Sequence, residues 1–189
     1  MAGKDIMENR IRCSWCNIKN PLYVKYHDDE WCKLNLDDTY LFEMLLLESF
    51  QAGLSWECIL NKREEFRKAY DNFNVNSICL YDDNKIDELL KNPKIIRNKL
   101  KIKASIKNAQ IFRKIQEEYG SFHNYLKQYT NDQVIYETGK IKNYISDMLS
   151  KDLKERGMKF VGSTIIYSYL QAIGIIYSHD ETCFLYRKK

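Results

Sequence analysis

The strongest constraint on the fold is the apolar run Leu41 to Leu47, which only Glu43 interrupts. Such a run predicts a buried helix over residues 37–52, and Gly53 is placed to end it in a left-handed conformation. Around this helix Glu43 and Glu48 lie about 140° apart. With Glu43 in water, Glu48 points toward the interior or a cleft, and Gln51 lies on nearly the same face as Glu48.

The residues after Gly53 predict a sharp corner between two helices. Ser55 is placed to cap a second helix over 55–70, and Glu57 in its first turn favours the helix dipole. The Glu48 carboxylate, the Gln51 amide and the Trp56 indole then converge at this corner. The same spacing also fits a half-exposed helical glutamate beside a core tryptophan, and spacing alone leaves that alternative open.

The rest of the chain is predicted to be mostly α and to form a single domain. It has only 7 Gly and 2 Pro and no clear alternating segment. Further helices are expected over 21–31, 83–91, about 98–119, 142–156 and 163–173, with a short element over 72–79 and a loop over 130–142. Residues 1–10 are polar and are expected to be disordered, which leaves one domain over 11–189.

Apolar patterning also bears on location. No apolar run approaches the length that spans a bilayer, and residues 1–10 contain no apolar signal core. We therefore expect a cytoplasmic protein without a membrane partner. Nothing in the sequence demands more than a monomer.

Basic residues concentrate in one stretch of the chain. Residues 92–116 contain eight of the 30 Lys and Arg residues and no acidic residue. A helix, a short Pro-containing turn and a basic helix form the outline of a helix-hairpin-helix, which offers backbone N–H groups to a DNA phosphate. The usual Gly-x-Gly turn is missing, so a solvated basic helix is the alternative. The candidate DNA-binding residues are Lys94, Arg97, Lys99 and Lys101.

The cysteines allow two kinds of chemistry. Cys13 and Cys16 form a Cys-x-x-Cys, which is typical of redox proteins when a βαβ unit follows, and none is predicted here. His179 and Cys183 are four residues apart, so a helical turn would place both on one side as metal ligands. Cys58 and Cys79 lie in apolar helical surroundings and are expected to be core thiols. His123 has no evident partner and is expected on the surface.

Aromatic residues are dense in the first third of the chain. Tyr23, either Tyr26 or His27, and Trp31 roughly share a face of the helix expected over 21–31. The other two tryptophans are Trp15 and Trp56. An aromatic core stripe is the plain interpretation of this spacing. Electron-rich rings are also what a site for a flat cationic base requires.

Several segments together resemble the type I DNA-3-methyladenine glycosylases, which belong to the helix-hairpin-helix glycosylase superfamily. They are PLYVKYHDDEW (21–31), LESFQAGLSW (47–56), IIRNKLKIKASIKNAQ (95–110) and KFVGSTIIYSYLQA (159–172). The resemblance spans roughly residues 12–183. It implies a structural zinc ion that ties the two chain ends together, with the ligands Cys13, His27, His179 and Cys183. Cys16 or Cys32 could replace Cys13 in a rival set.

The resemblance also implies an activity. A monofunctional glycosylase of this family hydrolyses the N-glycosidic bond of 3-methyladenine in alkylated double-stranded DNA and releases the free base. Glu48 would be the catalytic residue that reads the flipped base. The base-binding residues would be Trp15, Tyr23, Tyr26, Trp31, Gln51 and Trp56.

The sequence departs from the family pattern at three places, which leaves other functions open. These are Cys32, the Ser49-Phe50 pair beside Glu48, and a cysteine-poor C-terminal segment. The Ser49-Phe50 change could alter the shape of the pocket or its substrate range. The first alternative is a non-catalytic DNA-damage or nucleic-acid binding module of the same fold. A cytosolic redox protein using Cys13 and Cys16 is the second alternative.

Overall fold

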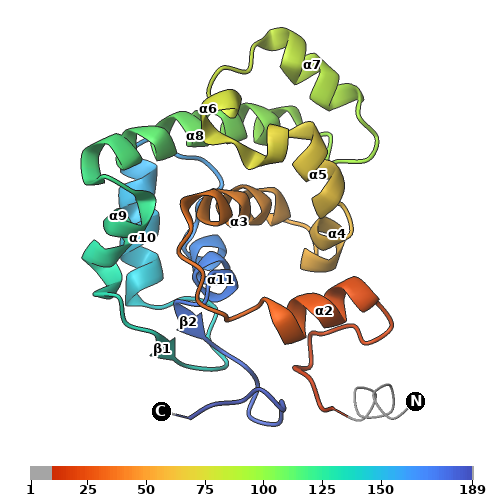
Figure 1. The fold of residues 1–189 in the computed structure, drawn as a ribbon, viewed down its shortest axis with the longest axis vertical. Coiled ribbons are helices and arrows are strands. Elements are labelled where there is room, and N and C mark those ends of the chain that lie inside the picture. Colours follow the sequence, from red (N-terminus) through yellow and green to blue (C-terminus); the bar gives the residue numbers. More distant parts are fainter. Residues whose placement is uncertain (1–9, 189) are drawn as a thin grey trace.

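The computed structural model describes residues 10–188, and the chain is mostly helical, as expected (Figure 1). The disorder expected for residues 1–10 lies outside the described residues, except at Arg10. The elements are α2 (Pro21–Asp29), α3 (Asp38–Gln51), α4 (Trp56–Leu60), α5 (Arg63–Ala69), the 3-10 helix η1 (Asp71–Phe73), α6 (Val75–Ile78), α7 (Asp83–Lys91), α8 (Lys99–Tyr119), α9 (Phe122–Thr130), β1 (Ile135–Tyr136), α10 (Tyr144–Glu155), α11 (Ser163–Ala172) and β2 (Ile176–Tyr177).

Helix α3 is the centre of the fold. Its residues are buried without a break from Leu41 to Phe50, because α8, α11, α4 and α9 all pack against it (Figure 1). A helix that is apolar on nearly every face is stable only in such a position. The Asp37 carboxylate caps its first turn by accepting from the backbone N–H groups of Thr39 and Tyr40.

Burial of α3 on all sides changes one expectation, because Glu43 does not face water. Its side chain is buried and accepts hydrogen bonds from Arg63 Nε at 2.7 Å and Arg67 Nη2 at 2.6 Å. The helix expected over 55–70 is also two helices, α4 and α5, with a bend at Asn61 and Lys62. The bend turns the start of α5 toward α3, so that Arg63 reaches Glu43.

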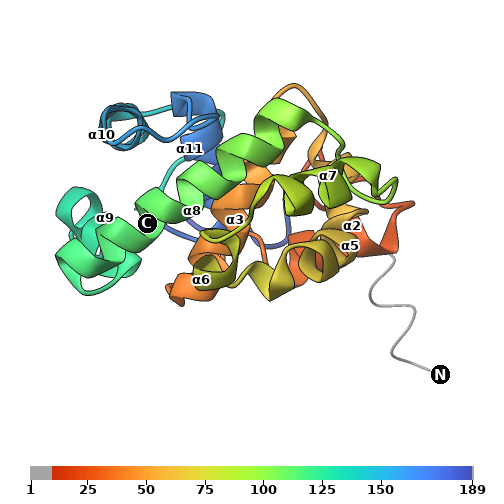
Figure 2. The ribbon, with the colours of Figure 1, turned by 90° about the horizontal axis from the view of Figure 1, so that it is seen from above.

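The helix-hairpin-helix outline is confirmed. Helix α7, the connection 92–98 and the long helix α8 form one end of the molecule, and α8 crosses over α3 (Figures 1 and 2). The Asn98 side chain caps α8 by accepting from the N–H groups of Leu100 and Lys101. Gly120, with φ 83°, ends α8 in the left-handed conformation.

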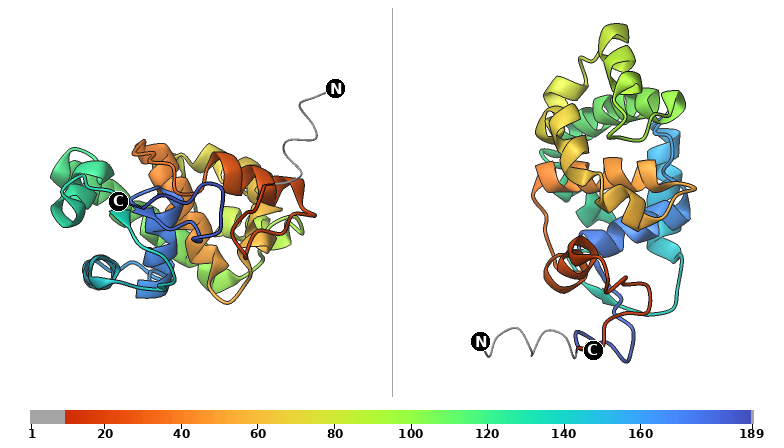
Figure 3. Two further views of the ribbon diagram at one scale, coloured as in Figure 1. Left: turned by 90° about the horizontal axis from the view of Figure 1, so that it is seen from below. Right: turned by 90° about the vertical axis from the view of Figure 1, so that its right-hand side faces the viewer.

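The described chain ends lie together at the opposite end of the molecule from the hairpin (Figures 1 and 3). Phe184 donates its N–H to the Ile11 carbonyl at 2.8 Å, and Ser14 donates its N–H to Asp180 Oδ2 at 2.7 Å. Above them, part of the expected loop 130–142 is the strand β1, which pairs in parallel with β2. Sequence patterning could not reveal this pair, because two residues per strand are too few to show alternation.

Several smaller expectations are corrected. The N-cap of α11 is Gly162, and Ser163 is the first helical residue. His123 has partners, since its N–H donates to Asp38 Oδ1 and its Nε2 lies 3.0 Å from Asp132 Oδ1. Cys79 is buried as expected, whereas Cys58 is only half-buried. Within residues 10–188, no helix is long and apolar enough to cross a membrane.

Candidate active site

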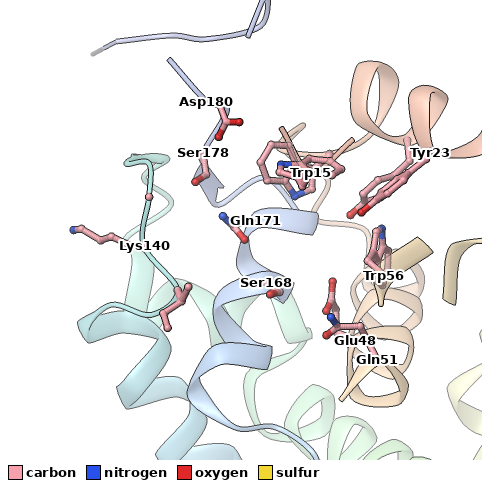
Figure 4. A pocket seen from close by; sticks show the side chains of 14 residues that line it. Trp15, Tyr23, Glu48, Gln51, Trp56, Lys140, Ser168, Gln171, Ser178 and Asp180 are labelled. Carbon is pink, nitrogen blue, oxygen red and sulfur yellow. The ribbon is translucent and has the colours of Figure 1, made fainter. Parts of the chain in front are cut away.

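A cavity of about 520 Å³ lies where α2, the end of α3, the start of α4 and α11 meet (Figure 4). All seven residues that the sequence assigned to base recognition line it: Trp15, Tyr23, Tyr26, Trp31, Glu48, Gln51 and Trp56. The cavity is therefore built around the corner predicted from the end of α3. Gly53, with φ 79°, and the Ser55 cap of α4 form that corner as expected.

Glu48 is the polar residue at the base of this cavity. The residue is only 4% exposed, and Oε2 has no hydrogen-bond partner among the described residues. Burial raises the pKa of Glu48 to about 8, because ionisation away from water is costly. An acceptor in this state gains from a ligand that donates a hydrogen bond or carries positive charge.

The Trp56 indole provides a second unused group. Its Nε1 is buried without a partner in the described chain, and its ring lies 5.3 Å from the Tyr26 ring. On the other side, Trp15 packs edge-on against Trp31 at a centroid distance of 4.6 Å. Flat aromatic walls with one donor and one acceptor left free suit a planar heterocycle.

The opposite wall was not predicted from the sequence. It consists of Gly139, Lys140, Ile141, Ser168, Gln171, Ser178 and Asp180 (Figure 4). Ser168 and Gln171 lie three residues apart on α11, which places both on one helical face, and this spacing was the signal available. Ser178 and Asp180, on either side of His179, line this wall, whereas His179 itself belongs to the cluster of metal-ligand candidates.

The Ser49-Phe50 pair does not line the cavity, although it lies beside Glu48 in the sequence. Phe50 packs against Phe66 at 4.8 Å and belongs to the core behind α3. Ser49 donates its hydroxyl to the Leu45 carbonyl at 2.8 Å. This departure from the family pattern therefore lies in the core and not among the lining residues.

The departure from the family pattern at Cys32 is understood from the backbone conformation and the contacts of this residue. It adopts φ 61°, a conformation that favours glycine, and the family pattern has glycine here. Its buried sulfur accepts the N–H of Ser178 at 3.3 Å, a bond that glycine cannot make.

Three of the four candidate DNA-binding residues are exposed, as contact with DNA requires. Lys94, Arg97 and Lys99 are exposed around the hairpin connection, beside the capped start of α8. The expectation for Lys101 is corrected, because its side chain is buried and donates to carbonyl groups at the end of α3. Its ammonium is therefore withdrawn from the surface on which a phosphate would lie.

The four metal-ligand candidates come together behind the cavity. Their ligand atoms, from Cys13, His27, His179 and Cys183, all lie within 4.8 Å of one another, and all four residues are buried. Cys13 Sγ is 3.4 Å from His179 Nδ1, and Cys183 Sγ is 3.5 Å from His27 Nε2. Ideal zinc–sulfur and zinc–nitrogen bonds in a tetrahedron separate such atoms by about 3.5 Å. Neither Cys16 nor Cys32 belongs to this cluster.

An outer layer of contacts supports the cluster. His27 Nδ1 lies 2.7 Å from Asp28 Oδ1, which leaves Nε2 directed at the cluster. Arg12 holds both Asp28 oxygens through Nε and Nη2 at 2.8 and 2.7 Å. Carboxylates commonly orient metal-binding histidines in this way. His179 and Cys183 lie in an irregular turn and not in the helical turn that their spacing suggested.

The redox alternative is not supported by the thiol environment. Burial raises the pKa of Cys16 to about 11 and also raises that of Cys13. A redox Cys-x-x-Cys depends on a lowered thiol pKa, usually at the start of a helix in a βαβ unit. Cys13 and Cys16 occupy a turn that precedes α2 instead.

A helix-hairpin-helix beside an aromatic cavity with a buried carboxyl group defines a DNA-binding protein of the base-excising glycosylase class. The family model described as methyladenine glycosylase matches residues 15–186. The chain belongs to the methyladenine glycosylase family.

Individual relatives agree with this family. The chain is 37% identical over 181 residues to DNA-3-methyladenine glycosylase 1 of Escherichia coli strain K12, covering 93% of this chain and 96% of that protein. A crystal structure of 3-methyladenine DNA glycosylase I superposes with a TM-score of 0.88 at 38% identity, covering 94% of this chain and all of that one. A Staphylococcus aureus structure, described as showing the basis of 3-methyladenine recognition, has a TM-score of 0.88 at 33% identity and covers 94% and 97% of the two chains.

Proposed function

We propose that the protein is a monofunctional DNA glycosylase that hydrolyses the N-glycosidic bond of 3-methyladenine in alkylated double-stranded DNA. The observation that carries this proposal is the unpaired, buried Glu48 carboxyl group between aromatic walls. The relatives named for 3-methyladenine excision or recognition match nearly the whole chain. The product would be free 3-methyladenine.

Glu48 would select the base through hydrogen bonding and through a charge that it gains on binding, because the free carboxyl group holds its proton and a cationic base stabilises the ionised form. A 3-methylated adenine carries positive charge while it is attached to the sugar, and the aromatic walls and a carboxylate both favour a cation. Normal adenine is uncharged and leaves the Glu48 carboxyl group without a partner. A buried polar group that only one of two ligands can satisfy discriminates strongly between them, here in favour of 3-methyladenine. The cationic base is already a good leaving group, so the site acts by binding the flipped base and orienting it.

The residues around the cavity support the monofunctional character. A glycosylase with lyase activity needs an amine nucleophile in the site. Among the described lining residues the one lysine is Lys140, and its Nζ is held 2.7 Å from Glu137 Oε2. Gln51, at the end of α3, is the lining amide nearest in sequence to Glu48 and would help to orient the base or the attacking water.

DNA would approach the hairpin and the corner beside the cavity. Backbone N–H groups near Asn98 and the exposed Lys94, Arg97 and Lys99 suit phosphate binding. Leu54 lies 38% exposed at the tip of the corner, between the lining residues Gln51 and Trp56. An apolar side chain in this position suits the space that a flipped base leaves in the duplex.

The Cys₂His₂ cluster would hold a structural zinc ion. Its ligand types and spacings fit four-coordinate zinc with no open position for substrate. Such an ion would tie the two described chain ends together and add its binding energy to the stability of the fold. We further propose that the protein is a monomer that acts in the cytoplasm.

Base release is the direct test. The purified protein is incubated with methylated DNA, the freed bases are resolved by chromatography, and Glu48→Gln is run beside it. Release of 3-methyladenine by the native chain, strongly reduced in the variant, is the expected result. Tight binding to methylated DNA without any released base would instead identify a non-catalytic damage-binding module.

A further inference from the structure

Lys101 is a buried cation that pairs with no carboxylate of residues 10–188. The residue is only 8% exposed, and the salt bridges of the basic stretch involve other residues, such as Lys94. Its ammonium donates instead to two backbone carbonyls, those of Phe50 at 2.8 Å and Ala52 at 2.6 Å. Burial lowers the pKa of Lys101, so the charge is kept at this place against a desolvation cost.

The two carbonyls belong to the end of the helix that carries Glu48. The last turn of a helix leaves its carbonyls without intrahelical partners, and a cation there is favoured by the helix dipole. After Ala52 the chain turns through Gly53, where a side chain would meet no atom within 4 Å, so the corner is open to solvent on that side. Among the described residues, Lys101 supplies the side-chain hydrogen bonds that reach the backbone of 50–54 from another element.

Lys101 is also part of the DNA-binding hairpin. It lies in the first turn of α8, two residues after Lys99, and its backbone N–H donates to the Asn98 side chain that caps this helix. One residue therefore joins the hairpin cap, through its backbone, to the corner beside the base cavity, through its ammonium.

We propose that Lys101 is a positioning residue that fixes the corner 52–54 relative to the hairpin, so that DNA held at the hairpin presents its target nucleotide to the cavity. This proposal rests on the proposed glycosylase function. It predicts that Lys101 matters for excision from duplex DNA and not for the affinity of the cavity itself, since Glu48 precedes the two carbonyls and lies within the regular helix.

The test compares Lys101→Met with Lys103→Met, which removes an exposed charge from the same helix. Single-turnover release of 3-methyladenine is measured at saturating protein, together with DNA affinity and the affinity for free 3-methyladenine from tryptophan fluorescence. In Lys101→Met we expect release to slow by about 10- to 100-fold, as a displacement near 1 Å does elsewhere. Free-base affinity should stay within about threefold, and Lys103→Met should release the base at nearly the native rate.

Other outcomes overturn the proposal. If Lys101→Met loses DNA affinity but releases the base at the native rate when saturated, Lys101 is a phosphate ligand. If the affinity for the free base and the rate of release fall together, the substitution disturbs the cavity itself, and Lys101 does not act by positioning the corner. Lys101→Arg keeps a charged donor and should retain release within about threefold, even if the Met variant does not fold; a slow Arg variant refutes the positioning role. A native chain that releases no base refutes the proposed function, and with it this inference.

Discussion

Replacing Glu48 by Gln should make the protein more stable at alkaline pH. Burial raises the pKa of Glu48 from its ordinary value of 4.5 to about 8. Between these pH values the folded state binds a proton that the unfolded state has released, so stability falls as the pH rises through the window. A glutamine at this position cannot ionise, which removes this fall while keeping the shape of the protonated carboxyl group.

The magnitude follows from the width of the window. Within this window only the folded state holds the proton, and each pH unit lowers the free energy of unfolding by about 1.4 kcal/mol. From pH 5 to pH 8, ionisation of Glu48 should therefore cost the native chain about 3 to 4 kcal/mol relative to Glu48→Gln. For a domain of this size that difference corresponds to about 10 °C in melting temperature.

Thermal unfolding without DNA, followed by circular dichroism at pH 5 and pH 8, measures this difference. The two proteins should melt within a few degrees of each other at pH 5 and diverge at pH 8, with the variant higher. Glu43→Gln is the matched control on the same helix: Glu43 is buried too but paired with Arg63 and Arg67. This control should melt lower than the native chain at pH 8. Equal pH dependence in the native chain and Glu48→Gln would show that Glu48 is not held protonated by burial.

Three further predictions concern the metal, the DNA and the base. Metal analysis should find about one zinc per chain, and a His179→Ala, Cys183→Ser double variant should lose it together with thermal stability; retained zinc would exclude this ligand set. A triple Lys94→Ala, Arg97→Ala, Lys99→Ala variant should lower the salt dependence of DNA binding by about 2 to 3 counterions, with free-base affinity unchanged; an unaltered salt slope would place the DNA elsewhere. Trp56→Phe removes the unpaired indole N–H and should weaken the binding of free 3-methyladenine about 3- to 30-fold, as measured by fluorescence titration. Equal affinity in the two proteins would show that Nε1 does not contact the base.

The near wall of the cavity could be predicted because it is local in sequence. Glu48, Gln51 and Trp56 follow one another within nine residues, so helical periodicity and one glycine fix their relation. The far wall could not, because Ser168, Ser178 and Asp180 come from elements more than a hundred residues away. Only tertiary packing, including the short β1–β2 pair, brings them opposite Glu48.

Lys101 was misassigned because a basic run was treated as one exposed surface. The run contains a buried polar stripe, Lys101, Ser105 and Asn108, at helical spacing beside the apolar residues of α8. Asn108 bonds the backbone of Lys159 at both N and O, each at 2.9 Å, and Ser105 contacts Tyr70. Polar residues that follow the apolar face of a helix indicate bonds to neighbouring backbone, a signal that composition alone conceals.

The cluster that joins the chain ends also sets the order in which the protein can become functional. His179 packs against Trp31 at 4.8 Å, and Asp180 accepts from the backbone N–H of Ser14. The wall beside Trp15 and Trp31 therefore needs a segment about 148 to 166 positions further along the chain. Every helix of the described chain precedes that segment. During synthesis the helical scaffold and its hairpin can therefore form while the cavity is still open on one side. The cavity therefore closes on that side only when residues 178–184 pack against residues 11–16.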